Sequence, residues 1–447
     1  MLNVILCMDS KYGIGLNNEL PWGITDELKI FKEKTQNSIL IAGRKTAQSL
    51  PILHNRLLFV VSRNQSPSNI REFFILFNSV DEAIQEALKM KKNVFVIGGA
   101  EIYNYVFEKY KSILNIHVSI LKDSYECDTF LREDILKNFY ITKKFDHEKF
   151  THYEMVYKEH GEQQYLNLIK DIVGNADLRD TRNSKTLSVF CKHLKFDLRD
   201  GFPLLTSKKM FFKGIIEELL FFIRGHTDSS ILEEKGINIW KGNTSREFLD
   251  NNGFKHRKEG EMGPMYGYQW RYFNARYDPI TSQPSEKGVD QLKEVIDLIK
   301  INPSSRRILL TTYNPSQVYE GVLYPCHSIT IQFYVQDGYL DMFCYNRSSD
   351  IGLGLPFNIA SSSLLQMIIA QLTELKPRYF NLTLGDAHIY QNHIEPLKEQ
   401  IERLCYTFPK LVMPEFKTLM DVERLNFRDF KIEDYRCHEP VKMDMVA

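Results

Sequence analysis

Short apolar runs alternate with amphipathic stretches along the first 157 residues of the chain. Runs rich in β-branched and aromatic residues occupy positions 3–8, 38–43, 56–62, 93–99 and 113–120. Residues 25–35 and 80–91 carry apolar side chains at helical spacing instead. This alternation predicts an α/β domain built around a sheet.

The pattern changes after residues 158–164, a polar segment with one glycine and no periodicity. Longer helical patterns then cover 165–173, 214–225, 289–300 and 359–375, and strand patterns cover 328–336 and 339–346. We therefore predict a first domain at 1–157, a short linker at 158–164, and an α+β domain with a large sheet at 165–447.

Composition and charge narrow the class of protein. Apolar residues make up 43% and charged residues 26% of the 447 positions, as in ordinary globular proteins. Lys+Arg and Asp+Glu are equal at 57 each, so no global field favours nucleic acid or an anionic membrane. The N-terminus lacks a basic leader and reads as a buried strand, and we expect no segment apolar enough to span a bilayer. Seven scattered cysteines without CxxC spacing indicate reduced thiols in the cytoplasm.

Three glycine-containing motifs follow strands of the first domain: GIGLNNELPW at 13–22, ILIAGRKT at 39–46 and FVIGGAEIY at 95–103. A GxG turn or a GG pair alone usually marks only a backbone bend. The order and spacing of all three, however, resemble dihydrofolate reductases over almost all of residues 1–157. The resemblance implies dihydrofolate as substrate and NADPH as cofactor.

The resemblance also implies a folate site. Glu27 matches the carboxylate that binds the pteridine and helps to protonate its N5 atom. Phe31 is implied to line the same pocket, and Arg56 matches the arginine that binds the α-carboxylate of the folate glutamate. Outside this motif, Glu27 would be interpreted as a solvated carboxylate in the first turn of a helix.

An NADPH site is implied in the same way. Arg44, Lys45 and Thr46 open a helix after a strand, and with Ser62 and Arg63 they match residues that recognise the 2′-phosphate. The remaining implied cofactor contacts are the pair Gly98 and Gly99, which lets the pyrophosphate approach the backbone, Tyr103 on the nicotinamide side, and Cys7, Ile14, Gly15, Ala100, Glu101 and Ile102.

The second domain carries longer motifs: PCHSITIQFYV at 325–335, YNRSSDIGLGLPFNIAS at 345–361 and LGDAHIYQNHIEPL at 384–397. With RDTRNSKTLSVF at 179–190 and VKMDMVA at 441–447, they resemble thymidylate synthases from about Tyr165 to the last residue. The resemblance implies that deoxyuridylate (dUMP) is methylated by 5,10-methylenetetrahydrofolate, and it implies no metal in either domain.

Four residues are implied in the chemistry of this domain. Cys326, expected at the start of a strand, matches the nucleophile that adds to C6 of the uracil ring. Arg347 is expected to lower the pKa of this thiol. Glu218, on a helix between apolar neighbours, matches a proton-relay carboxylate, and Tyr266 matches the tyrosine near the C5 proton.

The remaining synthase residues are implied to bind the nucleotide or the folate. They are Arg182, Arg306, Arg307, Arg347 and Ser348 for the phosphate, His388 and Tyr390 for the ribose, Asn358 and His327 near the base, Asp350 for nucleotide and pterin, and Trp240 beside the folate. In the family, the arginines that match Arg306 and Arg307 come from the partner subunit. The resemblance therefore implies a homodimer through this domain.

The two implied reactions are linked. After Cys326 has added to deoxyuridylate, the enolate attacks the methylene group, C5 loses a proton, and hydride transfer from tetrahydrofolate gives thymidylate and dihydrofolate. The first domain would reduce that dihydrofolate, and tethering raises the local concentration of one site near the other.

The chain departs from both family patterns at a few positions. In the first domain these are Cys7 for Ala, Ala47 for Trp, Ser119 for Thr, and a short loop from Pro51 to Arg56. In the second they are Asn346 for Gln, Tyr324 for Pro, Lys241 for an acidic residue, and Ala447 for Val. We expect both activities to survive with altered rates.

Two other interpretations are open. A deoxycytidylate hydroxymethylase shares the cysteine nucleophile but adds water to the methylene, and Asn358 is the position that discriminates it. A folate-binding or RNA-binding scaffold with decayed sites is the non-enzyme alternative. Intact Cys326, Glu218, Arg347 and Glu27 count against decay.

Overall fold

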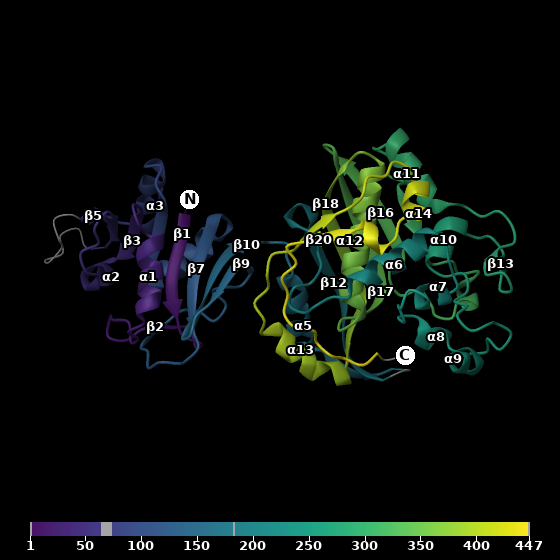
Figure 1. Ribbon diagram of the computed structural model, residues 1–447, viewed down its shortest axis with the longest axis horizontal. Helices are drawn as coiled ribbons and strands as arrows, with labels where there is room; N and C mark the ends of the chain where they lie inside the picture. The colour runs from purple at the N-terminus through teal and green to yellow at the C-terminus, as the bar shows by residue number, and fades with distance from the viewer. Residues whose placement is uncertain (1, 64–73, 182–183, 446–447) are drawn as a thin grey trace. The chain divides into compact units, whose positions relative to one another are not determined.

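The computed structural model describes residues 2–63, 74–181 and 184–445. The chain divides into two compact units, Met1–Glu159 and His160–Ala447, each with its own sheet (Figure 1). The division falls inside the segment 158–164.

Unit 1 contains an eight-stranded sheet in the order β5-β4-β3-β6-β1-β7-β10-β9. The strands are β1 (Leu2–Met8), β3 (Ile39–Gly43), β4 (Leu57–Val61), β5 (Phe74–Phe77), β6 (Val94–Gly98), β7 (Leu114–Leu121), β9 (Phe139–Asp146) and β10 (Phe150–Tyr157). Pairing is parallel from β5 to β7 and antiparallel for β10 and β9. The predicted α/β fold and its five strands are confirmed.

Among the described residues of unit 1 there are also four α-helices, a short 3-10 helix at Lys111–Ile113 and a small two-stranded sheet. The α-helices are α1 (Thr25–Lys34), α2 (Arg44–Ser49), α3 (Val80–Lys89) and α4 (Ala100–Lys109), and β2 (Gly13–Gly15) pairs with β8 (Thr129–Phe130). Asp9 fixes the turn before β2, because its carboxylate accepts hydrogen bonds from the backbone N–H groups of Lys11 and Gly13.

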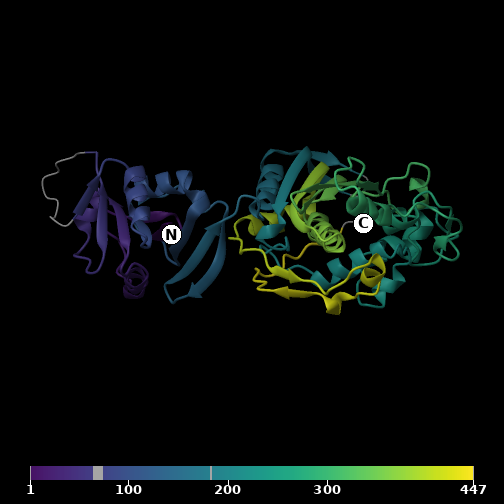
Figure 2. The same cartoon turned by 90° about the horizontal axis from the view of Figure 1, so that it is seen from above.

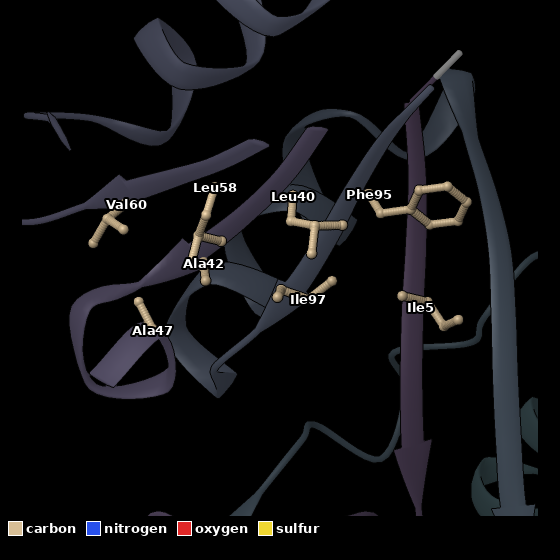
Figure 3. Close-up of a cluster of buried hydrophobic side chains, with 8 residues drawn as sticks. All are labelled: Ile5, Leu40, Ala42, Ala47, Leu58, Val60, Phe95 and Ile97. Atoms are coloured by element: carbon tan, nitrogen blue, oxygen red, sulfur yellow. The ribbon is translucent and has the colours of Figure 1, made fainter. Parts of the chain in front are cut away.

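The core of unit 1 joins the central strands to α2. Figure 3 shows its buried side chains: Ile5, Leu40, Ala42, Ala47, Leu58, Val60, Phe95 and Ile97. Phe31 of α1 packs against this cluster, and so do Leu50 and Leu53 of the loop after α2. Each large aliphatic side chain buried in this way stabilises the fold by about 1.5–3 kcal/mol. The core therefore anchors α1, which carries Glu27 and Phe31, and the loop after α2, which leads to Arg56.

Unit 2 contains a six-stranded sheet in the order β11-β12-β18-β17-β16-β15. The strands are β11 (Asp177–Asp180), β12 (Lys185–Asp197), β15 (Leu309–Thr311), β16 (Thr330–Gln336), β17 (Tyr339–Asp350) and β18 (Lys376–Tyr390). Only β17 and β18 pair in parallel. The predicted α+β domain with a large sheet is confirmed, although β12 and β18 were not among the predicted strands.

The α-helices of unit 2 precede, separate and follow the strands of this sheet along the chain. They are α5 (Gln163–Asn175), α6 (Phe212–Ile223), α7 (Ser230–Glu233), α8 (Lys241–Thr244), α9 (Arg246–Asn251), α10 (Gly267–Tyr272), α11 (Gln291–Ile301), α12 (Gly354–Leu372), α13 (Ile394–Ile401) and α14 (Leu419–Glu423). Two small antiparallel sheets pair β13 (Tyr277–Asp278) with β14 (Gln283–Pro284), and β19 (Lys410–Val412) with β20 (Lys431–Glu433). Figure 2 shows the yellow C-terminal segment with the second of these sheets along one side of unit 2.

Helix α12 packs against β17 and β18 and is the longest helix of the described residues (Figure 1). Its length and hydropathy would allow it to cross a membrane, so the expectation that no segment is apolar enough was wrong. However, 72% of the apolar window is buried inside the fold, as is typical of a core helix.

Candidate functional site

The first site centres on Glu27 in the first turn of α1. Its side chain is only 5% exposed, and burial raises the pKa of its carboxyl to about 7. The Ser119 hydroxyl on β7 lies close enough to this carboxyl to act in the opposite direction and lower its pKa. Trp22 and Cys7 are buried in a cluster beside it. The pocket therefore contains a carboxyl group that can hold a proton near neutral pH.

Arg56 is fixed by the C-terminal end of α1. Its Nε donates to Thr35 Oγ1 at 2.9 Å, and its Nη2 donates to the Lys32 carbonyl at 2.7 Å. A third hydrogen bond, from Nη1, reaches the His54 carbonyl at 3.3 Å. A guanidinium has five N–H donors, so this orientation leaves donors for a carboxylate. Phe31 is half-buried on the same helix.

The glycine pair after β6 lies against the start of α2. A Cβ atom on Gly99 would lie 3.3 Å from Thr46 Oγ1, and one on Gly98 would lie 3.1 Å from the Tyr103 ring. Gly98 has φ of +115°, which side chains rarely tolerate. The Tyr103 hydroxyl donates to the Ile5 carbonyl at 2.8 Å. Side chains at Gly98 and Gly99 would therefore crowd Tyr103 and Thr46.

The other cofactor candidates lie on several elements of unit 1. Arg63 lies 3.5 Å from Glu101 in an exposed ion pair, which joins the end of β4 to the start of α4. Arg44 and Lys45 are exposed at the first turn of α2, and Ser62 is buried. The remaining candidates lie on β1 (Cys7), on β2 (Ile14 and Gly15) and in the first turn of α4 (Ala100 and Ile102).

The second site centres on Cys326. Its Sγ atom lies 3.4 Å from the Tyr266 hydroxyl, which also accepts a hydrogen bond from the Cys326 backbone N–H at 3.2 Å. Arg347 donates through Nε to the Pro325 carbonyl at 3.2 Å. The cysteine lies in a loop four residues before β16, because β16 begins at Thr330, so its predicted place at the start of a strand was wrong.

Two opposing effects act on the pKa of the Cys326 thiol. The charge of Arg347 lowers this pKa, as the sequence predicted, and the Tyr266 hydroxyl lowers it as well. Burial raises the pKa and exceeds both contributions, so the net shift is upward.

A buried carboxyl group lies in the same aromatic cluster. Trp240 Nε1 donates to Glu218 at 2.9 Å, and burial raises the pKa of Glu218 to about 7. The Tyr266 ring lies 5.8 Å from Trp240 and stacks on His327 at 4.3 Å. Burial lowers the pKa of His327 to about 4, so its ring is neutral at physiological pH. The cluster thus joins the carboxyl group to the thiol.

Tyr266 has an unusual backbone. Its φ of +41° and ψ of −101° occur directly before α10. Such a conformation of a non-glycine residue stores strain of about 1–3 kcal/mol and persists where surrounding contacts require it. Here the 1% exposed ring and the contacts with Cys326 hold it in place.

Asn358, near the start of α12, contacts a buried asparagine of β17. Asn346 Nδ2 donates to Asn358 Oδ1 at 3.5 Å, and Asn346 Oδ1 accepts from the Ser328 backbone N–H at 2.9 Å. The sequence identified Asn346 only as a departure from the family. Its contact with Asn358 was missed, because the two residues lie on different elements.

Parallel pairing of β17 and β18 assembles the other nucleotide candidates. Ser348 pairs with Asp386, and Asp350 pairs with His388. The ring of Tyr390 lies 5.2 Å from the ring of His388. Gly385 permits this pairing, because a Cβ atom there would lie 2.5 Å from the Arg347 carbonyl oxygen.

Asp350 also organises the turn into α12. Its carboxylate accepts hydrogen bonds from the backbone N–H groups of Gly352 and Leu353 at 2.9 and 3.2 Å. Burial opposes its ionisation, but His393 and these N–H groups hold the pKa of its carboxyl below the ordinary value. His393 Nδ1 lies 3.7 Å away and its Nε2 lies 2.7 Å from the Asp444 carbonyl. No pattern in the sequence indicates this link to the C-terminal segment.

Of the implied phosphate arginines, three lie within the described residues. Arg306 and Arg307 are exposed in the turn before β15, and Arg347 is exposed on β17. Arg182 lies outside the described residues. Two of the departures have local partners: Tyr324 contacts the Tyr319 ring at 5.5 Å, and Lys241 lies 3.5 Å from Glu233.

Family models match both units of the chain. A dihydrofolate reductase model matches residues 1–161, and a thymidylate synthase model matches residues 163–447. Together they cover nearly the whole chain.

Relatives that carry both domains match along the full length. A bifunctional dihydrofolate reductase-thymidylate synthase of Paramecium tetraurelia is 39% identical over 463 residues, covering 100% of this chain and 98% of the relative. The protein of the same name from Zea mays is 37% identical and covers 99% and 96%. The one from Plasmodium chabaudi is 36% identical and covers 93% and 84%.

Proposed function

The chain belongs to the family of bifunctional dihydrofolate reductase-thymidylate synthases, and from this premise we propose that Glu27 and Cys326 are the reacting groups of its two activities. The protein is an oxidoreductase that reduces dihydrofolate with NADPH, and a methyltransferase that converts deoxyuridylate to thymidylate with methylenetetrahydrofolate. The observation that carries the residue assignment is the pair of buried carboxyl groups, Glu27 and Glu218, each beside one set of family motifs.

In the reductase unit, Glu27 delivers the proton that the reduction consumes. Its pKa of about 7 means that roughly half of the carboxyl groups carry a proton near neutral pH, ready for transfer to N5 of the pterin. Bound NADPH supplies the hydride. Gly98, Gly99 and Thr46 would hold its pyrophosphate, since only a glycine backbone leaves room there. Arg56 would bind the folate α-carboxylate.

In the synthase unit, Cys326 adds through its sulfur to C6 of deoxyuridylate and later leaves as the product is released. Its thiol must first lose a proton, which the positive charge of Arg347 favours. The Tyr266 hydroxyl, 3.4 Å from Cys326 Sγ, would hydrogen-bond near the C5 proton that departs, and Glu218 would take up or release a proton through the aromatic cluster.

Asn358 would recognise the uracil base. Its Oδ1 accepts from Asn346 and keeps a second lone pair for uracil N3–H, while its Nδ2 can donate to O4. Cytosine presents the opposite pattern at these two atoms, so the same amide would reject it. Ser348, His388 and Tyr390 would contact the phosphate and the ribose.

We infer that the protein is a homodimer through unit 2, and that Arg306 and Arg307 bind the phosphate in the partner's site. The sheet supports this proposal. Leu309, Tyr334 and Phe343 are exposed by 45%, 62% and 37%, and the strand register puts them on one face of β15, β16 and β17. An apolar sheet face of this kind is typical of a subunit interface.

We also propose a cytoplasmic location, with no requirement for nucleic acid or membrane. All seven cysteines are free thiols, which fits a reducing compartment. The equal numbers of basic and acidic residues give no overall attraction to anionic polymers.

Paired assays on variants test these assignments. Glu27→Gln should greatly slow NADPH oxidation with dihydrofolate and leave thymidylate formation near normal. Cys326→Ser should abolish thymidylate formation and leave the reductase near normal. Equal loss of both activities in either variant, with folding intact, would contradict the division of chemistry between the two units.

A further inference from the structure

A stripe of polar side chains lies beneath α1 on the sheet of unit 1. In the strand register, Ser119 of β7 pairs with His152 of β10, and His117 of β7 pairs with Glu154 of β10. Paired residues of neighbouring strands point to the same face, and so do residues two apart on one strand. All four side chains therefore project on one face of the sheet.

Helix α1 covers both ends of this stripe. Glu27 in its first turn contacts the Ser119 hydroxyl, and Lys34 in its last turn donates to Glu154 at 2.5 Å. Between them, the His152 ring stacks on the His117 ring with centroids 6.1 Å apart. The stripe thus runs from the proposed catalytic carboxyl group to the end of the helix.

His152 is the partner of Ser119 on the side away from Glu27. Its Nδ1 lies 3.1 Å from Ser119 Oγ, and the residue is only 2% exposed. Its Nε2 is buried and has no hydrogen-bond partner within the described part of the chain. Burial lowers the pKa of His152 to about 4, so the ring is neutral and carries a single N–H.

A neutral imidazole has two tautomers, so Nδ1 faces Ser119 either as a donor that carries the proton or as an acceptor without it. When Glu27 is ionised, the serine hydroxyl donates to the carboxylate, and Nδ1–H donates to Oγ. When Glu27 is protonated, its O–H donates to Oγ, the serine hydroxyl donates to a bare Nδ1, and the ring proton is on Nε2. Each form satisfies all three groups along the chain from Glu27 to Nδ1.

We propose that His152 is a positioning residue of the reductase, which acts through Ser119 so that its tautomer follows the protonation of Glu27. The proposal rests on the assignment of Glu27 as the proton donor. His152 touches no reacting atom. It gives the Ser119 hydroxyl a hydrogen-bond partner in both protonation states of Glu27. When Glu27 is protonated, the Ser119 hydroxyl therefore still has an acceptor for its own proton.

Other ionisable groups face this cluster from every neighbouring element. Around Glu27 they are Cys7 of β1, Asp9 after it and Tyr103 of α4. Around His152 they are His117, Glu154, Lys34, Lys143 of β9 and His147 of the β9–β10 turn. Because these groups remain in a His152 variant, a change of pH profile in that variant reports on the imidazole itself.

The test is the pH profile of the hydride-transfer step, measured by single-turnover NADPH oxidation in the full-length protein. In His152→Leu the serine hydroxyl has only Glu27 left as an acceptor, which favours the carboxylate. We expect the apparent pKa of the step to fall by about 0.5–1 pH unit, the equivalent of one ordinary hydrogen bond. His152→Gln, which can donate or accept, should restore most of the wild-type profile.

Ser119→Ala makes the test specific. If His152 acts through Ser119, His152→Leu should cause no further pH shift when Ser119 is already alanine. His117→Phe is the matched control, because it removes the neighbouring imidazole that does not contact Ser119, and it should leave the profile unchanged.

An equal shift from His152→Leu in both backgrounds, the same shift from His117→Phe, or no shift would overturn the proposal. Thymidylate formation and the unfolding temperature of unit 1 report whether each variant is folded. Glu27→Gln tests the catalytic role of Glu27 separately from the role of His152. Unchanged reductase activity in that variant would refute the assignment of Glu27 as the proton donor.

Discussion

Asn346 Nδ2 donates a hydrogen bond to Asn358 Oδ1 at 3.5 Å, from the middle of β17 to the start of α12. Asn346 is fully buried, and its own Oδ1 is held by the Ser328 backbone N–H. The direction of both amides is therefore set by the backbone of the loop that carries Cys326. One hydrogen-bond network therefore connects the proposed base-reading residue to the loop that carries the proposed nucleophile.

The first prediction concerns nucleotide choice. Asn358→Asp should shift the preference from deoxyuridylate toward deoxycytidylate, because a carboxyl group can accept from the cytosine N4 amine and share a proton with N3. Asn346 can still donate to the new carboxylate. One mispaired buried group is worth about 1–3 kcal/mol, so the ratio of specificity constants should change by roughly 10- to 100-fold. Asn358→Ala should weaken both substrates without reversing the preference, and an unchanged ratio in Asn358→Asp would mean that Asn358 does not read the base.

The second prediction links catalysis in unit 1 to stability. The folded pKa of Glu27 is raised from 4.5 to about 7, so folding favours the protonated form, and the stability of unit 1 falls as pH rises from about 4.5 through 7. Glu27→Gln removes this penalty. The variant should gain about 3 kcal/mol at pH 8 and less than about 1 kcal/mol at pH 5.

Urea unfolding of the unit 1 transition at the two pH values measures this gain. Asp26→Asn is the control. Asp26 precedes Glu27 in the chain but is exposed, and Lys29 lowers the pKa of the Asp26 carboxyl. The Asp26→Asn variant should give no gain at pH 8. A Glu27→Gln variant that is equally stabilised at both pH values would contradict the burial of an ionisable carboxyl group.

The third prediction concerns the reactivity of Cys326. Arg347→Met removes the positive charge that lowers the pKa of the thiol, so this pKa should rise further by about 0.5–1 pH unit. Alkylation by iodoacetamide, followed at the Cys326 peptide by mass spectrometry across pH, measures it. Arg347→Lys retains the charge and should show a smaller shift. If the two variants behave alike, the charge of Arg347 does not act on the thiol.

The fourth prediction tests the shared site of the homodimer. Chains carrying Cys326→Ser and chains carrying Arg306→Ala should each be poor synthases, but their co-expression should restore activity by building one intact site per hybrid dimer. Cys326→Ser combined with Glu218→Gln is the matched control. Both changes fall on the same side of a site, so this pair should stay inactive. Failure of the first pair to complement would indicate that each subunit supplies its whole site.

The sheet face provides an independent check of the dimer. Tyr334→Glu places a charge among the exposed residues Leu309 and Phe343 of β15 and β17. We expect sedimentation to show monomers, with loss of synthase activity and retention of reductase activity. A Tyr334→Glu protein that remains dimeric would exclude this face as the interface.

Local patterns predicted β1, β3, β4, β6 and β7 of unit 1, because each of these five strands is a largely apolar run of at least five residues between polar turns. Strand β18 was missed in unit 2 for a physical reason. It contains Pro377, Gly385 and Asp386, which are uncommon in strands, and it forms because β12 and β17 pair with it on both sides. Tertiary pairing of this kind leaves no local signal.

The candidate site was predicted where a residue belongs to a motif, and missed where it acts through a distant partner. Glu27 and Cys326 lie in such motifs, whereas His152 belongs to none and was not singled out. Its position follows from the pairing of β10 with β7, which brings it to Ser119 from 33 positions away. The motif at Cys326 predicted the effect of the nearby arginine on the thiol pKa but not the larger, opposite effect of burial, because depth of burial depends on tertiary packing.

The carboxyl groups Glu27 and Glu218 reach a pKa of about 7 independently, each by burial in its own unit. One unit releases dihydrofolate and the other consumes it. A fall or rise in the pH of the cell therefore changes the protonated fraction of both groups in the same direction and by a similar amount. Under the roles proposed above for Glu27 and Glu218, both activities are therefore expected to change over the same range of pH.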